Sequence, residues 1–224
     1  MRQSILLLAI AAIAAIIGVG CATSSGDGAP AVSARAVETT NDGLRRVESD
    51  RPGDLFLREA HGIGGYDAIV VAPSFVNYKR SSNRLDPDVE VAYLAASEQA
   101  VLDAAEEAGA PIVQKPGDCT IAIGVGFLNV ELARSDTADV LGEMVFVIQY
   151  QDSMSGEALL RYVEPQRIER ESGGISREQQ ISNSFDRMIE EVNVTGALRA
   201  ATGTPSGPRP GCKGNLVRVG LPAE

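Results

Sequence analysis

Residues 120–131 read TIAIGVGFLNVE and alternate between large and small side chains from one position to the next. Successive residues of a strand point to opposite faces of its sheet. One face would carry Ile121, Ile123, Val125 and Phe127, and the other would carry Thr120, Ala122, Gly124 and Gly126. A face of such small residues accepts a helix packed close against it. The stretch therefore predicts a long strand in a sheet that is covered by a helix on its small-residue face.

Two further strands follow this one along the chain. Residues 142–150 and 158–163 are apolar runs joined by Asp152-Ser153-Met154-Ser155-Gly156. Asp, Ser and Gly are turn-forming residues, so this segment predicts a β-hairpin. Upstream, residues 66–75 contain the run DAIVVA, which is typical of a strand buried on both faces, and Pro73 ends its pairing.

A first helix is predicted from Pro87 to about residue 108, with Asp86 as its N-cap. A 3.6-residue wheel gives it an apolar stripe of Val91, Leu94, Ala95, Leu102 and Ala105. Glu98 falls within that stripe, so we expect it to face the sheet. One interpretation makes Glu98 a structural acid that either pairs with an arginine, for which Arg161 is the candidate, or leans to the rim of the helix. The other makes it a buried functional acid.

A second helix is predicted from Ser176, which forms a capping box with Gln179. Its apolar side chains recur at helical spacing and comprise Ile181, Phe185, Met188 and Val192. The stripe slips beyond them, so we expect the helix to end or bend near Gly196. A Gly/Pro-rich tail follows, and residues 215–219 could form a last short strand.

These elements predict an α+β fold with a mostly antiparallel sheet, two helices on one face and the order β-α-β-β-β-α. We expect a signal peptide at 1–20, a lipidated flexible tether at 21–43, the domain at 44–202 and an irregular tail at 203–224. The tether is predicted from its Ser, Gly, Ala and Thr content, which shows no hydrophobic period.

The N-terminal residues have the pattern of a secretion signal. Arg2 precedes an apolar run at 5–17, which is too short to span a bilayer, and small residues lead to Cys21. The pattern resembles the bacterial lipoprotein signal, although Gly18 stands where Leu is usual, and it implies lipidation of Cys21 with a palmitate-type acyl chain. Ala22 in place of Asp resembles the sorting pattern for the outer membrane. The alternative is an ordinary secretory signal.

The composition of the chain disfavours some classes of partner and indicates the make-up of the core. The chain of 224 residues has a formal net charge of −10, which disfavours nucleic acid and anionic lipid headgroups as partners. Aromatic residues make up 4% and Trp is absent, so the core is expected to consist of Val, Ile, Leu and Ala. If Cys21 is lipidated, two cysteines are left, namely Cys119 and Cys212. In an oxidising compartment these two are expected to form a disulfide, and two buried thiols are the alternative.

No reaction is indicated by the residues. His61 is the only histidine, no Gly-x-Ser-x-Gly motif is present, and one His with two distant Cys does not match the ligand spacing of a zinc site. Gly62, Gly64 and Gly65 precede a strand, whereas a dinucleotide motif follows one. We therefore expect no catalytic residues, no metal and no cofactor.

Three stretches carry a family resemblance, namely RPGDL at 51–55, GYDAIVVAP at 65–73 and DSMSGE at 152–157. With them the chain resembles a family of proteobacterial lipoproteins, domain of unknown function three-three-one-three, over about residues 51–200. It departs from that family at Phe185, near which similar proteins tend to carry a Trp. The resemblance implies an envelope lipoprotein and carries over no catalytic residue.

The leading functional hypothesis is a non-enzymatic, lipid-anchored protein whose domain docks onto another envelope protein from the periplasmic side. One alternative is a periplasmic module that binds a small molecule or lipid, which would need a deep apolar pocket. The other is an enzyme with a carboxylate site that includes Glu98. The sequence leaves the oligomeric state open.

Overall fold

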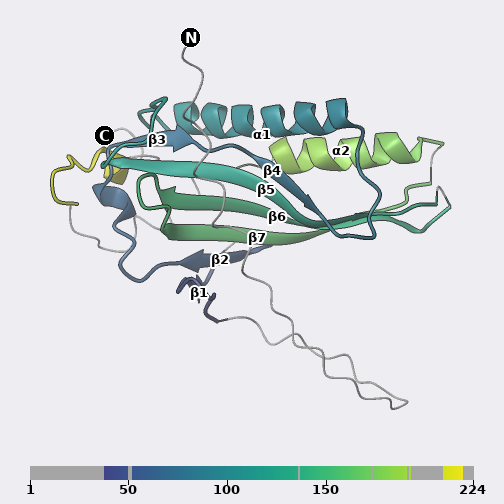
Figure 1. Ribbon diagram of the computed structural model, residues 1–224, viewed down its shortest axis with the longest axis horizontal. Coiled ribbons are helices and arrows are strands. Elements are labelled where there is room, and N and C mark those ends of the chain that lie inside the picture. The colour runs from purple at the N-terminus through teal and green to yellow at the C-terminus, as the bar shows by residue number, and fades with distance from the viewer. Residues whose placement is uncertain are drawn as a thin grey trace, which may run out of the picture.

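The computed structural model describes residues 38–49, 52–135, 137–172, 174–190, 192 and 209–218. These residues form an α+β fold with one seven-stranded sheet and two α-helices (Figure 1). The strands are β1 (Arg45–Val47), β2 (Asp54–Leu57), β3 (Ala68–Val71), β4 (Phe75–Tyr78), β5 (Thr120–Leu132), β6 (Val140–Asp152) and β7 (Ala158–Glu169). The helices are α1 (Pro87–Glu107), α2 (Arg177–Glu190) and the short 3-10 helices η1 (Ile63–Gly65) and η2 (Asn215–Arg218).

The sheet has the order β1-β2-β7-β6-β5-β3, and β4 also pairs with β5. The pairs β5–β6 and β6–β7 are antiparallel, and β2 continues the antiparallel arrangement on β7. β3 and β4 instead run parallel to β5. The predicted fold class is thus confirmed. The prediction lacked β1, β2 and β4, which have three or four residues each and, unlike β3, do not lie in a longer continuous apolar run.

The two helices pack on the large-residue face of β5, not on the small-residue face. Phe127 of β5 contacts Phe185 of α2, with ring centroids 4.9 Å apart. On the other face, Phe75 of β4 lies over Gly126, where an added Cβ would come within 2.4 Å of the Phe75 ring. The small residues of β5 therefore make room for the side chains of the neighbouring parallel strand, which the sequence pattern had not indicated.

An aromatic cluster joins both helices to the sheet. Tyr93 of α1 stacks on Phe185 at 4.9 Å, Phe185 meets Phe127, and Phe127 contacts Phe146 of β6 at 5.7 Å. The core therefore contains aromatic rings in addition to the Val, Ile, Leu and Ala that the composition predicted. The chain has few aromatic residues, and four of them are concentrated at this junction, where each ring buries much apolar surface.

The buried face of α1 differs from the predicted stripe. Its buried residues are Tyr93, Ser97, Val101 and Ala105, whereas Val91 is 65% exposed. Ser97 is tolerated inside because its hydroxyl donates to the Tyr93 carbonyl oxygen at 2.8 Å. The predicted face of α2 is confirmed, since Ile181, Phe185, Met188 and Val192 are all buried.

A second, smaller core lies on the sheet face that points away from the helices. Phe56 is paired with Arg161 in the β2–β7 register, and both lie on this face. Leu44, which is fully buried, packs here with Phe56 and Ala158. Asp42 forms an ion pair with Arg161 at 2.6 Å. Residues 38–43 are thus part of the folded structure, although the sequence assigns them to the tether.

The end of the chain adds no strand over its described part. Residues 215–218 form η2 where we predicted a short strand, and Leu216 is buried against the main core. The predicted bend near Gly196 lies outside the described residues. Among the residues that the structure describes, neither α-helix has the length and apolar character needed to cross a membrane.

Candidate functional site

Of the predicted site residues, Cys21 lies outside the described part of the chain. Cys119 and Cys212 form the expected disulfide, which joins the start of β5 to the segment before η2. Asp67 lies beside the two sulfur atoms. Thiolates bind metals, but both sulfur atoms are bonded to each other here. Asp67 also accepts backbone hydrogen bonds, so this arrangement favours a structural role over a metal site.

The disulfide is one of several contacts that hold residues 209–218 against the domain. One carboxylate oxygen of Asp67 accepts hydrogen bonds from the backbone N–H groups of Lys213 and Gly214, each at 2.7 Å. The N–H of Leu216 donates to the carbonyl oxygen of Tyr66 at 3.0 Å. These contacts form a C-terminal clamp, by which we mean residues 209–216 with their partners Tyr66, Asp67, Cys119 and Asp152.

An ionic cluster around the buried Asp152 completes the C-terminal clamp. The Tyr66 hydroxyl donates to Asp152 at 2.8 Å, and Arg209 forms an ion pair with the same oxygen at 2.9 Å. The other Asp152 oxygen accepts from the backbone N–H groups of Met154 and Ser155 and from the Ser155 hydroxyl. Sequence reasoning treated Asp152 as a turn former and missed its contact with Arg209, because the two residues are 57 positions apart along the chain.

The electrostatics of this cluster favour structure over catalysis. Burial by itself would raise the pKa of the Asp152 carboxyl, but the hydrogen bonds from Ser155, Tyr66 and Met154 outweigh burial and hold that pKa below its ordinary value. Burial and the adjacent Asp152 carboxylate raise the pKa of the Tyr66 phenol. Asp152 thus stays ionised and Tyr66 stays protonated near neutral pH, which suits a fixed hydrogen bond more than proton transfer.

His61 is buried beside η1. Its Nδ1 accepts the backbone N–H of Ile63 at 3.0 Å, and its Nε2 has no hydrogen-bond partner among the described residues. Burial lowers the pKa of His61, so the imidazole is neutral at pH 7. Because Cys119 and Cys212 are joined in the disulfide, no Cys–His pair is available within the described part of the chain.

Glu98 does not occupy the position that the wheel predicted. It is half-buried at the flank of α1, and its carboxylate accepts the backbone N–H of Ser74 at 2.9 Å. Arg161, its proposed partner, instead pairs with Asp42 and donates to Gln149 at 2.9 Å, on the other face of the sheet. The prediction failed because α1 is rotated about its axis relative to the wheel. Glu98 fastens the loop between β3 and β4 to α1.

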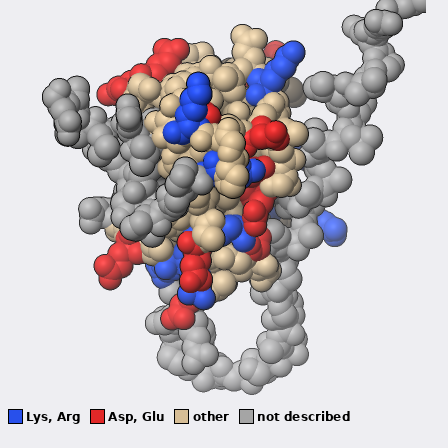
Figure 2. Space-filling view, turned by 90° about the vertical axis from the view of Figure 1, so that its left-hand side faces the viewer, with Lys and Arg blue, Asp and Glu red and all other residues tan. Residues whose placement is uncertain are grey.

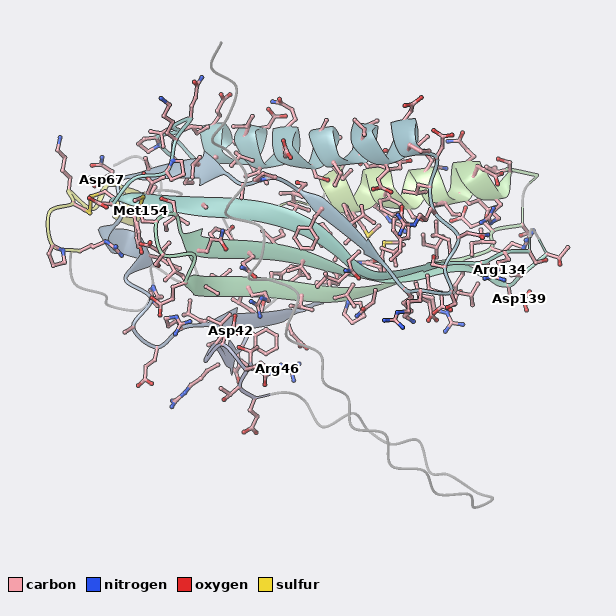
Figure 3. All side chains as sticks on the ribbon, in the orientation of Figure 1. Asp42, Arg46, Asp67, Arg134, Asp139 and Met154 are labelled. Carbon is pink, nitrogen blue, oxygen red and sulfur yellow. A yellow bond between two sulfur atoms is a disulfide. The ribbon has the colours of Figure 1, made fainter. Side chains whose placement is uncertain are left out.

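A surface hollow of about 980 Å³ lies beside the β1–β2 hairpin. Charged and polar residues line much of it, among them Glu38, Arg45, Arg46, Glu48 and Asp54. Asp42 and Arg46 mark this side of the molecule in Figure 3. The hollow is open and polar, so it is not the deep apolar pocket that a lipid-binding module needs.

Helix α1 is unusual in its charge. The helix carries six acidic residues and no Lys or Arg, the acids being Asp88, Glu90, Glu98, Asp103, Glu106 and Glu107. By contrast, acidic and basic side chains are interspersed on the end of the molecule that faces the viewer in Figure 2. In Figure 3 that end carries the labelled Asp67 and Met154, and the opposite end carries Arg134 and Asp139.

Comparison with known proteins leaves the family open. No protein-family model and no curated protein sequence matches the chain. Among solved structures, the PelC dodecamer from Paraburkholderia phytofirmans shares 13% identity over 66% of this chain and 93% of that chain, with a TM-score of 0.34. Protein XCC0632 from Xanthomonas campestris, of family DUF330, shares 11% over 62% and 89%, with a TM-score of 0.36.

Lipoprotein GNA1162 from Neisseria meningitidis is also similar, with 12% identity over 54% of this chain and 96% of that chain and a TM-score of 0.30. The similar structures therefore include bacterial lipoproteins, as well as a protein from a family of unknown function other than the one that the sequence resembles. At these scores the likeness does not assign the chain to a family. The resemblance to family three-three-one-three stays a prediction.

Proposed function

We propose that this chain is a lipid-anchored bacterial envelope lipoprotein, held in the outer membrane through Cys21, whose α+β domain acts in the periplasm as a non-catalytic accessory or docking subunit. The signal-like N-terminus and Cys21 support the anchor, and Ala22 supports the outer membrane as its destination. Two anchoring groups, a diacylglyceryl thioether and an amide-linked acyl chain, would give stable attachment.

One observation carries the docking role. Residues 38–44 enter the fold on the sheet face opposite the helices, where Leu44 is buried and Asp42 pairs with Arg161. An anchor attached at Cys21 reaches the domain through this side. In this arrangement α1 and α2 lie on the far side of the sheet from the point of attachment, so their outer surfaces are free to meet another envelope protein (Figure 1).

The polar clusters also support a non-catalytic reading. Asp152 is occupied by four donors in addition to Arg209, His61 is buried and neutral, and Glu98 is bonded to the Ser74 backbone. Each of these groups has a structural contact that explains its position. The enzyme hypothesis based on Glu98 therefore gains no support from its surroundings.

The anchor is tested by Cys21→Ser with mass spectrometry of the mature N-terminus. We expect acylated Cys21 in the natural chain and release of the Cys21→Ser variant from the membrane fraction. Ala22→Asp is the matched control, because it leaves the lipid in place and should change the membrane in which the protein is found. An unmodified Cys21, or cleavage at another position, would overturn the anchored-lipoprotein proposal.

A further inference from the structure

The outer face of α1 carries an apolar patch that the fold does not use. Val91 is 65% exposed and Val89 is 40% exposed, and neither packs into the core. The neighbouring outward positions are also uncharged and exposed, namely Ala92, Ala95, Ala96 and Gln99. We call these four residues, together with Val89 and Val91, the α1 patch. A helix exposed only to water normally places charged and polar residues on this side.

Acidic side chains border the α1 patch at both ends. Asp88 lies at its N-terminal end, and Asp103, Glu106 and Glu107 lie at its C-terminal end; all four are exposed. Acids near a helix N-terminus are favoured by the helix dipole, but acids in the last turns are disfavoured by it. The structure shows no basic residue in the last turn of α1 to offset them. Helix stability therefore does not account for this arrangement.

We propose that the α1 patch is the docking surface for a different protein, whose contact region is apolar and bordered by Lys or Arg. This inference rests on the proposed docking role and names the chemistry of the partner. Apolar contact would cover Val91 and the alanines, whose small side chains let a partner backbone approach closely. The basic border would pair with Asp88 at one end and with Asp103 and Glu107 at the other.

The same charges argue against the other occupants. If two copies met through the patch in antiparallel orientation, Asp103 and Glu107 of one copy would face Asp88 of the other, and in parallel orientation each acid would face its own equivalent. Both arrangements bring like charges together, which opposes association. An anionic lipid surface would be repelled for the same reason.

The test uses the full-length chain in its native cells with a photoreactive benzoylphenylalanine placed at Ala95, in the α1 patch. Asn183, an exposed neutral residue on the outer face of α2, receives the same group as the matched control. We expect an adduct with a second protein from position 95 and none from position 183. Mass spectrometry of the adduct should identify a contact segment that is apolar and bordered by Lys or Arg.

Charge reversal then tests the border. The double change Asp103→Lys and Glu107→Lys should reduce the adduct yield roughly threefold to tenfold, since exposed ion pairs each contribute little. Reversing the partner's basic residues to Glu should restore the yield. Membrane fractionation of the double variant checks that it still accumulates in folded, anchored form.

Several results would overturn the proposal: no adduct from position 95, equal adducts from both positions, an adduct between two copies of this chain, or a contact segment with an acidic border. These outcomes are separable from a failure of the anchor. Acylated Cys21 without an adduct would reject the docking surface alone. An adduct from position 95 with an unmodified Cys21 would reject the lipid anchor and keep the docking surface.

Discussion

The two helices cover the same sheet, yet only α2 has a clear separation of polar and apolar faces. In α2 most buried positions are apolar, with Gln180 and Ser184 as the polar members, and the exposed positions carry charges of both signs, as in Asp186 and Arg187. In α1 the inward face includes Ser97, and the outward face includes Val91 and three alanines. A wheel identifies the buried face only when the exposed face is polar. The wrong face predicted for α1 is therefore a consequence of its apolar outer patch.

The largest effect is expected from comparing two alanine substitutions in α1, at positions 91 and 93. Tyr93→Ala should lower the free energy of unfolding by about 3–5 kcal/mol, because it removes a buried ring from the aromatic cluster. Val91→Ala should change it by no more than about 0.5 kcal/mol, because Val91 is mostly exposed. Urea unfolding of both variants measures this. The opposite ranking would restore the predicted stripe.

A second test concerns Glu98, which α1 uses to hold the β3–β4 loop. Glu98→Ala should cost about 1–3 kcal/mol, because the buried N–H of Ser74 loses its acceptor. Glu98→Gln should cost much less, because the amide oxygen can accept the same hydrogen bond. Thermal and urea unfolding would show additivity of Glu98→Ala with Arg161→Met, since the two side chains do not contact each other. Strong coupling between them would contradict the structure.

The direct link between the helices provides a third test. The Tyr93 hydroxyl donates to the Ser182 hydroxyl at 2.6 Å. A double-mutant cycle of Tyr93→Phe and Ser182→Ala should give a coupling energy of about 0.5–1.5 kcal/mol in unfolding experiments. The ring stays in Tyr93→Phe, so the cycle isolates the hydrogen bond from the packing. A coupling of zero would mean that α1 and α2 are joined by packing alone.

The smallest change in stability is expected from reversing a charge at one end of each helix. Glu107→Lys should stabilise the protein by about 0.3–1 kcal/mol, because it replaces an acid with a base near the C-terminus of α1. Glu178→Lys should destabilise it by a similar amount, because Glu178 lies in the first turn of α2, where the dipole favours an acid. Melting temperatures at low salt would show the two signs. If Glu107→Lys raises the stability but lowers the adduct yield at position 95, binding explains the presence of the acid.

The sequence determined those features that depend on neighbours along the chain. The β6–β7 hairpin follows from its Asp152 to Gly156 turn, the start of α1 follows from Asp86 and Pro87, and the buried face of α2 follows from its helical period. The α+β class follows from the order of these elements. The disulfide between Cys119 and Cys212 was predicted from their number, because only these two cysteines remain beyond the signal.

Tertiary structure decided the contacts between distant segments. The orientation of α1 depends on the contact between Tyr93 and Phe185. The small side chains of β5 are needed because Phe75, from a neighbouring parallel strand, packs over Gly126. The cluster of Tyr66, Asp152 and Arg209 joins three separate parts of the chain. Local periodicity carries no information on which of two apolar faces gains more by burial. That choice is made by the shape and hydrogen-bonding groups of the surface on which the helix packs.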